Sequence, residues 1–157
     1  MSIAPYLASP MAVVRRMLKL AQVKPGEIVY DLGCGDGRIV ITAAREFGAY
    51  GVGIEIRRDL ALKAMRAVEE AGLADRVKII NANLFDVDIS DADVVTLYLT
   101  TSANLKVKPK LERELKPGAR VVSHEYEIPG WEPILVDEFS EDSRYRFLTH
   151  RIWLYRR

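Results

Sequence analysis

Apolar residues along the chain follow two alternating spacings. After Pro10, the residues Val14, Met17, Leu18 and Ala21 recur at the three- and four-residue steps of one helix face. Downstream, short runs rich in Val and Ile alternate with further segments of helical spacing, and Gly or Pro separates most of them. The short runs predict strands at residues 27–31, 51–55, 77–81, 93–99 and 119–126. The other segments predict helices at residues 38–47, 60–71 and 102–115.

Two prolines refine the predicted helices. Ser9 is expected to cap the first helix with its side chain, because Pro10 then takes the first helical position. The helix is expected to end at the sequence KPG, residues 24–26. Pro109 lies inside the 102–115 segment. We expect it to divide this helical region into two pieces, because proline suits the first turn of a helix.

The chain ends on a different pattern. Residues 134–139 and 145–155 are both β-like, and the polar residues 140–144 between them leave no room for a helix. Alternating strands and helices predict parallel strands with right-handed crossovers, whereas the last two strands must form an antiparallel hairpin. The expected fold is therefore α/β: a Rossmann-like, doubly wound, mostly parallel sheet with an antiparallel C-terminal hairpin. We expect one domain over residues 1–157, with residues 1–24 as its N-terminal segment and helix.

Composition excludes several classes of protein. The chain has 157 residues, of which 49% are hydrophobic and 29% charged, and its formal net charge is +1. The low charge disfavours a nucleic-acid partner, and the absence of a long apolar run disfavours a membrane partner. A single cysteine, Cys34, excludes an internal disulfide framework and a cysteine-based zinc site, so no metal site is expected. We expect a cytoplasmic monomer. The low number of Asn and Gln residues fits either a thermophilic source or GC-rich codon usage.

The most informative residues follow the first two predicted strands. The sequence DLGCGDG at residues 31–37 leaves the first strand and enters a helix, and Gly33 and Gly35 let a ligand approach bare backbone. Glu55 ends the second strand, where a carboxylate can accept hydrogen bonds from both hydroxyls of a ribose. In doubly wound sheets ligands bind at these carboxyl ends. The residues therefore predict a nucleotide-like ligand.

Two cofactors compete for this site. A dinucleotide fingerprint is Gly-x-Gly-x-x-Gly, whereas the spacing here is one residue shorter and follows Asp31. A carboxylate at that position would repel a pyrophosphate and attract the ammonium group of an amino acid. The pattern therefore favours S-adenosyl-L-methionine, which leaves as S-adenosyl-L-homocysteine after methyl transfer.

These residues resemble motif I of class I, seven-strand S-adenosylmethionine-dependent methyltransferases. The resemblance implies that Asp31, Gly33 and Gly35 surround the methionine end of the cofactor and that Glu55 binds its ribose. Ile56, next to that acid, is expected to pack on the adenine face. Asn83 and Leu84 follow the third strand, similar to the place where this family holds the adenine edge.

A narrower resemblance covers most of the chain. The motif PYLAS at residues 5–9, the extended motif I, TLYL at 96–99 and KPGARVVSHE at 116–125 are similar to small archaeal protein-lysine methyltransferases. These are related to the eukaryotic group once called family with sequence similarity 173. The resemblance implies that Tyr6 and Ser9 form a hook over the cofactor. Ala8 departs from the proline that the family often has there, and Tyr98 stands where an apolar aromatic residue is common.

The implied reaction is methylation of lysine ε-amines on proteins with broad specificity. A neutral amine needs positioning more than an enzymatic base, so Tyr98 is expected to position the acceptor. Acidic residues near the expected cleft would attract lysines: Asp86, Asp88, Glu125 and Glu127. His124 fits either a proton relay or a structural role. The alternatives are a methyltransferase for a small molecule or RNA, and a non-catalytic cofactor-binding protein.

Overall fold

The computed structural model describes residues 6–141 and 149–157. The strands of its sheet are β1 (Ile28–Leu32), β2 (Tyr50–Glu55), β3 (Val77–Asn81), β4 (Val94–Leu97), β5 (Arg120–His124), β6 (Leu135–Ser140) and β7 (Thr149–Arg156). The helices are α1 (Met11–Leu20), α2 (Arg38–Phe47), α3 (Arg58–Glu70) and α4 (Thr101–Glu114), with a short 3₁₀ turn η1 (Leu84–Asp86). In the described residues no helix has both the length and the apolar character that crossing a membrane requires.

The described strands form one seven-stranded sheet in the order β3-β2-β1-β4-β5-β7-β6. All neighbouring pairs from β3 to β5 are parallel, whereas β7 runs antiparallel to both β5 and β6. The predicted Rossmann-like sheet with an antiparallel C-terminal hairpin is therefore confirmed. The strand order reverses between β1 and β4, so the carboxyl ends of these two strands mark the place where such sheets bind ligands.

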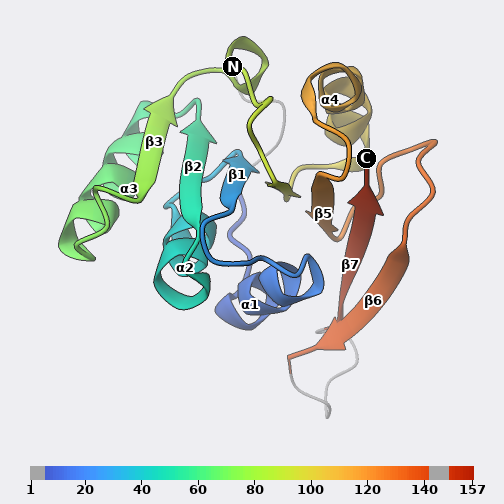
Figure 1. The fold of residues 1–157 in the computed structure, drawn as a ribbon, viewed down its shortest axis with the longest axis horizontal. Helices are drawn as coiled ribbons and strands as arrows, with labels where there is room; N and C mark the ends of the chain where they lie inside the picture. The colour runs from blue at the N-terminus through green and yellow to red at the C-terminus, as the bar shows by residue number, and fades with distance from the viewer. Residues whose placement is uncertain (1–5, 142–148) are drawn as a thin grey trace.

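Helices cover both faces of the sheet (Figure 1). Successive strand residues point to opposite faces, so Val94 packs with α1 and α2 while its neighbour Val95 packs with α4. The same alternation places Val121 on the α4 side and Val122 on the α1 side. Residues from α2, α3 and β3 form a third, smaller cluster. The central strands of the sheet are thus buried from both sides, whereas the edge strand β6 has no buried residue.

The predicted cap on α1 is wrong. Pro10 takes the N-cap position, and no side chain caps the helix. The Ser9 hydroxyl lies 2.9 Å from Nδ1 of His124, a residue 115 positions away in the chain. A long-range partner therefore replaces the local one that the sequence suggests.

The predicted break at Pro109 is also wrong, because α4 is one continuous helix with this proline inside it. Proline removes the hydrogen bond to the carbonyl four residues earlier, which belongs to Leu105. Leu105 is 54% exposed, so the missing hydrogen bond falls on the solvent side of the helix. Val107 and Leu111 are fully buried on either side of the proline and hold both halves of the helix in the core.

Candidate functional site

The loop after β1 is built on glycine backbone conformations. Gly33, Gly35 and Gly37 all have positive φ, at 90°, 56° and 84°. These angles are strained for residues with a side chain, which explains the glycines. The N–H groups of Gly33 and Cys34 donate to the Ile54 carbonyl at 2.8 and 2.9 Å, and this fixes the loop against β2.

Asp31 is a buried carboxylate directly before this loop. Its side chain accepts a hydrogen bond of 2.9 Å from the Thr96 hydroxyl on β4. Burial raises the pKa of Asp31 to about 7, and the negative charges of Glu55 and Asp36 add to the shift. A cation placed against Asp31 would offset this cost, so the carboxylate is suited to binding an ammonium group.

Glu55 at the end of β2 connects two loops. One carboxylate oxygen accepts from the Gly35 N–H at 2.8 Å, and the other accepts from the Arg57 N–H at 2.9 Å. The residue is only 7% exposed. The Asn81 side-chain amide donates to the Glu55 and Ile56 carbonyls, so β3 fixes the backbone on which the acid stands. Each carboxylate oxygen keeps a further lone pair for a ligand hydroxyl.

The N-terminal segment lies over the glycine loop. The Tyr6 ring covers Gly35 so closely that a Cβ on this glycine would collide with it. Arg38 donates to the Ser9 carbonyl at 3.1 Å, and Asp36 in turn binds the Arg38 guanidinium at 2.6 Å. The hook that the resemblance implies is therefore in contact with the loop and held there by an ion pair.

A pocket of about 290 Å³, part of it open to solvent, lies between the hook and the loop. It brings together six of the predicted site residues: Tyr6, Ser9, Asp31, Gly33, Gly35 and Tyr98. Its acidic residues are Asp31 and Asp36, and the four acids that the sequence suggested for the cleft do not line it. Cys34 also lines the pocket, but burial raises the pKa of its thiol far above neutrality, which excludes it as a nucleophile.

The other predicted cofactor residues lie outside this pocket. Glu55 reaches it only through its hydrogen bond to Gly35. Ile56, the residue after Glu55, is half-buried, and Leu84 is buried in the core. The Asn83 side chain accepts from the Phe85 N–H and caps η1. No contact of Ile56, Asn83 or Leu84 tests the adenine contacts expected of them, which stay predictions.

Tyr98 stands just past the end of β4 and lines the pocket. Its ring lies 4.0 Å from the His124 ring and 6.4 Å from the Tyr126 ring, measured between centroids. Burial and the neighbouring Tyr126 and Glu125 raise the pKa of the Tyr98 phenol, so it is protonated at neutral pH. Burial and His150 lower the pKa of His124 to about 4, so His124 is neutral there.

Sequence reasoning missed the residues that hold the site together. The Asp36–Arg38 pair fixes the hook, and both residues stand inside the recognised motif without any signal for this role. His150 on β7 lies 2.9 Å from His124, and Glu141 binds the other side of the His150 ring. Only the pairing of β5 with β7 reveals this second group.

The profile of one protein family matches residues 31–135, about two thirds of the chain, and its description is ANTKMT methyltransferase domain. The chain belongs to the ANTKMT methyltransferase family. The matched segment begins at Asp31 and includes the glycine loop, Glu55 and Tyr98.

Relatives of this ANTKMT-family chain support the assignment. A protein-lysine N-methyltransferase of Saccharolobus islandicus is 49% identical over 152 residues, which cover 96% of this chain and 92% of that protein. The mouse adenine nucleotide translocase lysine N-methyltransferase is 32% identical over 96% of this chain, which spans only 62% of the mouse protein.

A solved structure is also similar to this family member. The structure described as an RNA methyltransferase from Salinibacter ruber in complex with S-adenosyl-L-homocysteine has a TM-score of 0.87 and 45% identity. The match covers 96% of this chain and 93% of that one. The predicted fold and the predicted class of enzyme, an S-adenosylmethionine-dependent methyltransferase, are confirmed.

Proposed function

We propose that this enzyme methylates the ε-amines of lysine residues in proteins. The observation that carries the proposal is the 49% identity, over nearly the whole of both chains, with a protein-lysine N-methyltransferase. Two further relatives are named for methylating lysines of other proteins, the adenine nucleotide translocase and a component of ATP synthase. Each of these relatives is named for one target, so the broad specificity that the sequence resemblance implies is a separate part of the proposal.

The site residues fit S-adenosylmethionine, whose sulfonium supplies an electrophilic methyl group when it is bound. Asp31 is buried, and among the described residues its side-chain partner is the neutral Thr96 hydroxyl, so it would bind the ammonium group. Gly33 and Gly35 would let the methionine part approach the backbone, and Glu55 would bind the ribose. Ile56 would contact the face of the adenine ring, and Asn83 and Leu84 would contact its edge.

The chain offers the acceptor amine a position rather than a strong base. Tyr98 is protonated at neutral pH and can hydrogen-bond an amine that enters the pocket. His124 is neutral but fully buried, and its ring nitrogens face Ser9 and His150. The amine would therefore lose its proton to solvent before it reaches Tyr98, and orientation would supply most of the acceleration.

Lysine methylation is tested by mass spectrometry of a mixed protein extract incubated with the full chain and the cofactor. We expect mass gains of one or more methyl groups on lysines of several proteins, and none with the Glu55→Ala variant. The initial rate should rise with pH towards the lysine pKa of about 10.4, because only the neutral amine attacks.

RNA methylation is the second candidate, because the Salinibacter ruber relative is described as an RNA methyltransferase. A parallel incubation with total RNA separates the two functions. Methyl groups found on RNA and not on lysines would overturn the proposed substrate. The near-neutral net charge of +1 argues against that outcome, because RNA-binding surfaces are usually basic.

The hook is expected to act as part of the cofactor site. A chain that starts at Met11 should keep its fold, because α1 begins there, but should bind S-adenosylmethionine at least tenfold more weakly. Calorimetry measures the affinity and circular dichroism the fold. Tyr6→Ala is the matched variant, since it removes the ring over Gly35 and keeps the Ser9–His124 contact. Unchanged affinity in both variants would make the hook a structural tail.

We also propose that the protein is cytoplasmic and monomeric. The single cysteine, which is buried and unpaired, fits the reducing cytoplasm. A monomer is expected, and size-exclusion chromatography with light scattering measures this directly. The resemblance to archaeal enzymes also implies an archaeal source, which, like a thermophilic one, is a prediction.

A further inference from the structure

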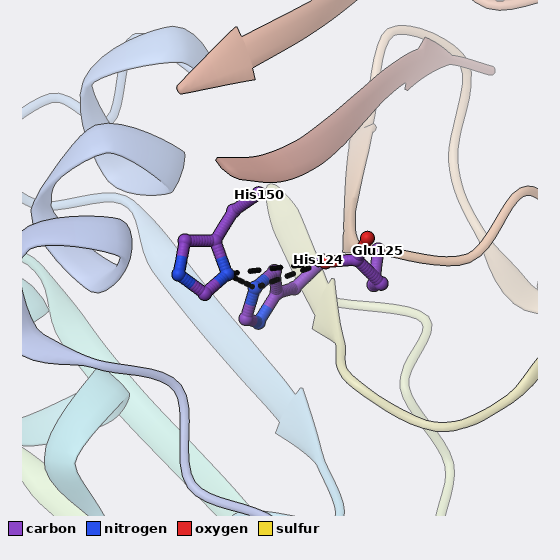
Figure 2. A group of neighbouring side chains, drawn as sticks. All are labelled: His124, Glu125 and His150. Atoms are coloured by element: carbon purple, nitrogen blue, oxygen red, sulfur yellow. Dashed lines mark hydrogen bonds and ion pairs between the residues drawn. The ribbon is translucent and has the colours of Figure 1, made fainter. Parts of the chain in front are cut away.

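Two histidines and a glutamate meet at the end of β5. His124 is the last residue of β5 and pairs with Ile152 on β7, so His150 stands two residues away on the same face of the sheet. Nε2 of His124 lies 2.9 Å from Nδ1 of His150. A carboxylate oxygen of Glu125 lies 3.9 Å from the first nitrogen and 3.8 Å from the second. Figure 2 shows the two rings facing each other with Glu125 beside them.

The backbone at Glu125 brings the carboxylate to this group. Adjacent strand residues normally point to opposite faces, which would separate Glu125 from His124. Glu125 instead has a φ of 73°, in the left-handed region that residues other than glycine seldom adopt. This conformation ends the strand and is held by a hydrogen bond from the Glu125 N–H to the Arg151 carbonyl. Such strain at a polar cluster is a recurrent feature of functional sites.

Both histidines are oriented from behind by a further polar group. The Ser9 hydroxyl lies 2.9 Å from Nδ1 of His124, and a Glu141 oxygen lies 2.7 Å from Nε2 of His150. Metal-bound histidines usually have such a partner on the second ring nitrogen, because it fixes the tautomer and the ring orientation. The nitrogens that remain, Nε2 of His124 and Nδ1 of His150, are the two that face each other.

We propose that His124, His150 and Glu125 bind one divalent transition-metal cation of the Zn²⁺ class. Two imidazoles and a carboxylate are ligands that Zn²⁺ accepts, and three protein ligands leave a fourth position for water. Tetrahedral bonds of about 2.0–2.1 Å would separate ligand atoms by about 3.3 Å. The separations of 2.9, 3.8 and 3.9 Å lie on both sides of this value, so shifts of about half an ångström or less build the site.

Cation binding is compatible with the hydrogen-bond partners of both rings. Without the ion, one consistent set of tautomers has Ser9 donating to His124, His124 donating to His150, and His150 donating to Glu141. With the ion between the two rings, the His124 proton moves to Nδ1 and donates to Ser9. Because Ser9 also lines the pocket, the cation would connect the β5–β7 pair to the hook. The site lies outside the cofactor pocket and does not depend on the identity of the substrate.

Titration of the tag-free, EDTA-treated full chain with ZnCl₂ by calorimetry tests the site. We expect one equivalent to bind, and an increase in the unfolding temperature with added ZnCl₂. His150→Gln and Glu125→Gln should each lower the affinity at least 10-fold. Glu141→Gln, which changes only the orienting partner, should lower it 10- to 100-fold. Glu138→Gln is the matched control, because Glu138 is an exposed carboxylate on the neighbouring strand β6.

The proposal is overturned if the full chain binds no Zn²⁺ or if His150→Gln and Glu125→Gln bind it as the Glu138→Gln control does. Either result would leave a hydrogen-bonded histidine pair without an ion. Glu125 is 38% exposed, so its conversion to Gln leaves the core intact, and circular dichroism checks that each variant is folded. Binding that survives in every variant would place the cation elsewhere in the chain and would equally refute this site.

Discussion

Replacing Glu55 by alanine is expected to lower the affinity for S-adenosylmethionine at least 100-fold. Two hydrogen bonds from ribose hydroxyls to a buried carboxylate are worth about 1.5–3 kcal/mol each, and every 1.4 kcal/mol is tenfold in affinity. Glu55 is only 7% exposed, so in the alanine variant water cannot easily take over the hydrogen bonds to the ribose. Isothermal titration calorimetry with the full chain measures the change.

Glu55 also holds the glycine loop, so its replacement needs two matched variants. Glu55→Gln keeps an oxygen that can accept from the Gly35 N–H, but loses the charge and one acceptor. Its affinity should lie between those of the original chain and Glu55→Ala. Asp59→Asn removes an exposed carboxylate of the neighbouring helix and should bind normally. Normal affinity in Glu55→Ala would remove Glu55 from the cofactor site.

The fold was predictable where local signals mark the ends of its elements. The helix over residues 38–47 and the strand over residues 77–81 have the predicted bounds. Helix α2 lies between Gly37 and Gly48, both with positive φ, so the backbone itself defines its ends. The alternation of strands and helices then determined the class of the sheet, because parallel strands need crossovers.

Prediction failed where a distant residue decides the local conformation. The strand expected over residues 119–126 ends at His124, because Glu125 adopts a left-handed conformation that a contact from β7 holds. Ser9 forms a hydrogen bond with His124 and does not cap helix α1. Pro109 stays inside α4 because the residues on both sides of it pack in the core. Glu125 and Ser9 bind residues far away in the chain, and Val107 and Leu111 beside Pro109 pack into a core that includes distant strand residues. Spacing alone could not find these partners.

The same division applies to the site. Asp31, Gly33 and Gly35 belong to one contiguous motif, and the pocket that they line was predictable from it. Arg38 and His150 act through contacts across 29 and 26 residues, and only the folded chain shows what they touch. The motif identifies the cofactor end of the site, whereas tertiary packing positions its hook.

The pocket contains a charge that opposes folding. Asp31 is buried among the negative charges of Glu55 and Asp36, and its pKa of about 7 lies well above the usual 3.8. An acid whose pKa is raised on folding costs no stability below its unfolded pKa, and the cost grows as pH rises. The cost reaches its full size above pH 7. The shift corresponds to about 4 kcal/mol at pH 8.

Asp31→Asn should therefore separate stability from cofactor binding. At pH 8 the ligand-free variant should unfold about 8–16 °C higher than the original chain, and the difference should shrink as pH falls towards 5. Its amide oxygen can still accept from the Thr96 hydroxyl, so the packing of β1 against β4 is kept. Scanning calorimetry at both pH values measures this change.

The same variant should bind S-adenosylmethionine at least 100-fold more weakly, because a neutral amide cannot offset the buried ammonium group that the carboxylate is proposed to bind. Titration calorimetry at pH 8 measures the loss, and Asp59→Asn serves again as the exposed control. A variant that is more stable but binds normally would show that Asp31 is strained for another reason. A variant that is less stable at pH 8 would show that the buried carboxylate is already compensated in the free protein. Gain of stability together with loss of binding is the result expected of a carboxylate kept buried for its ligand.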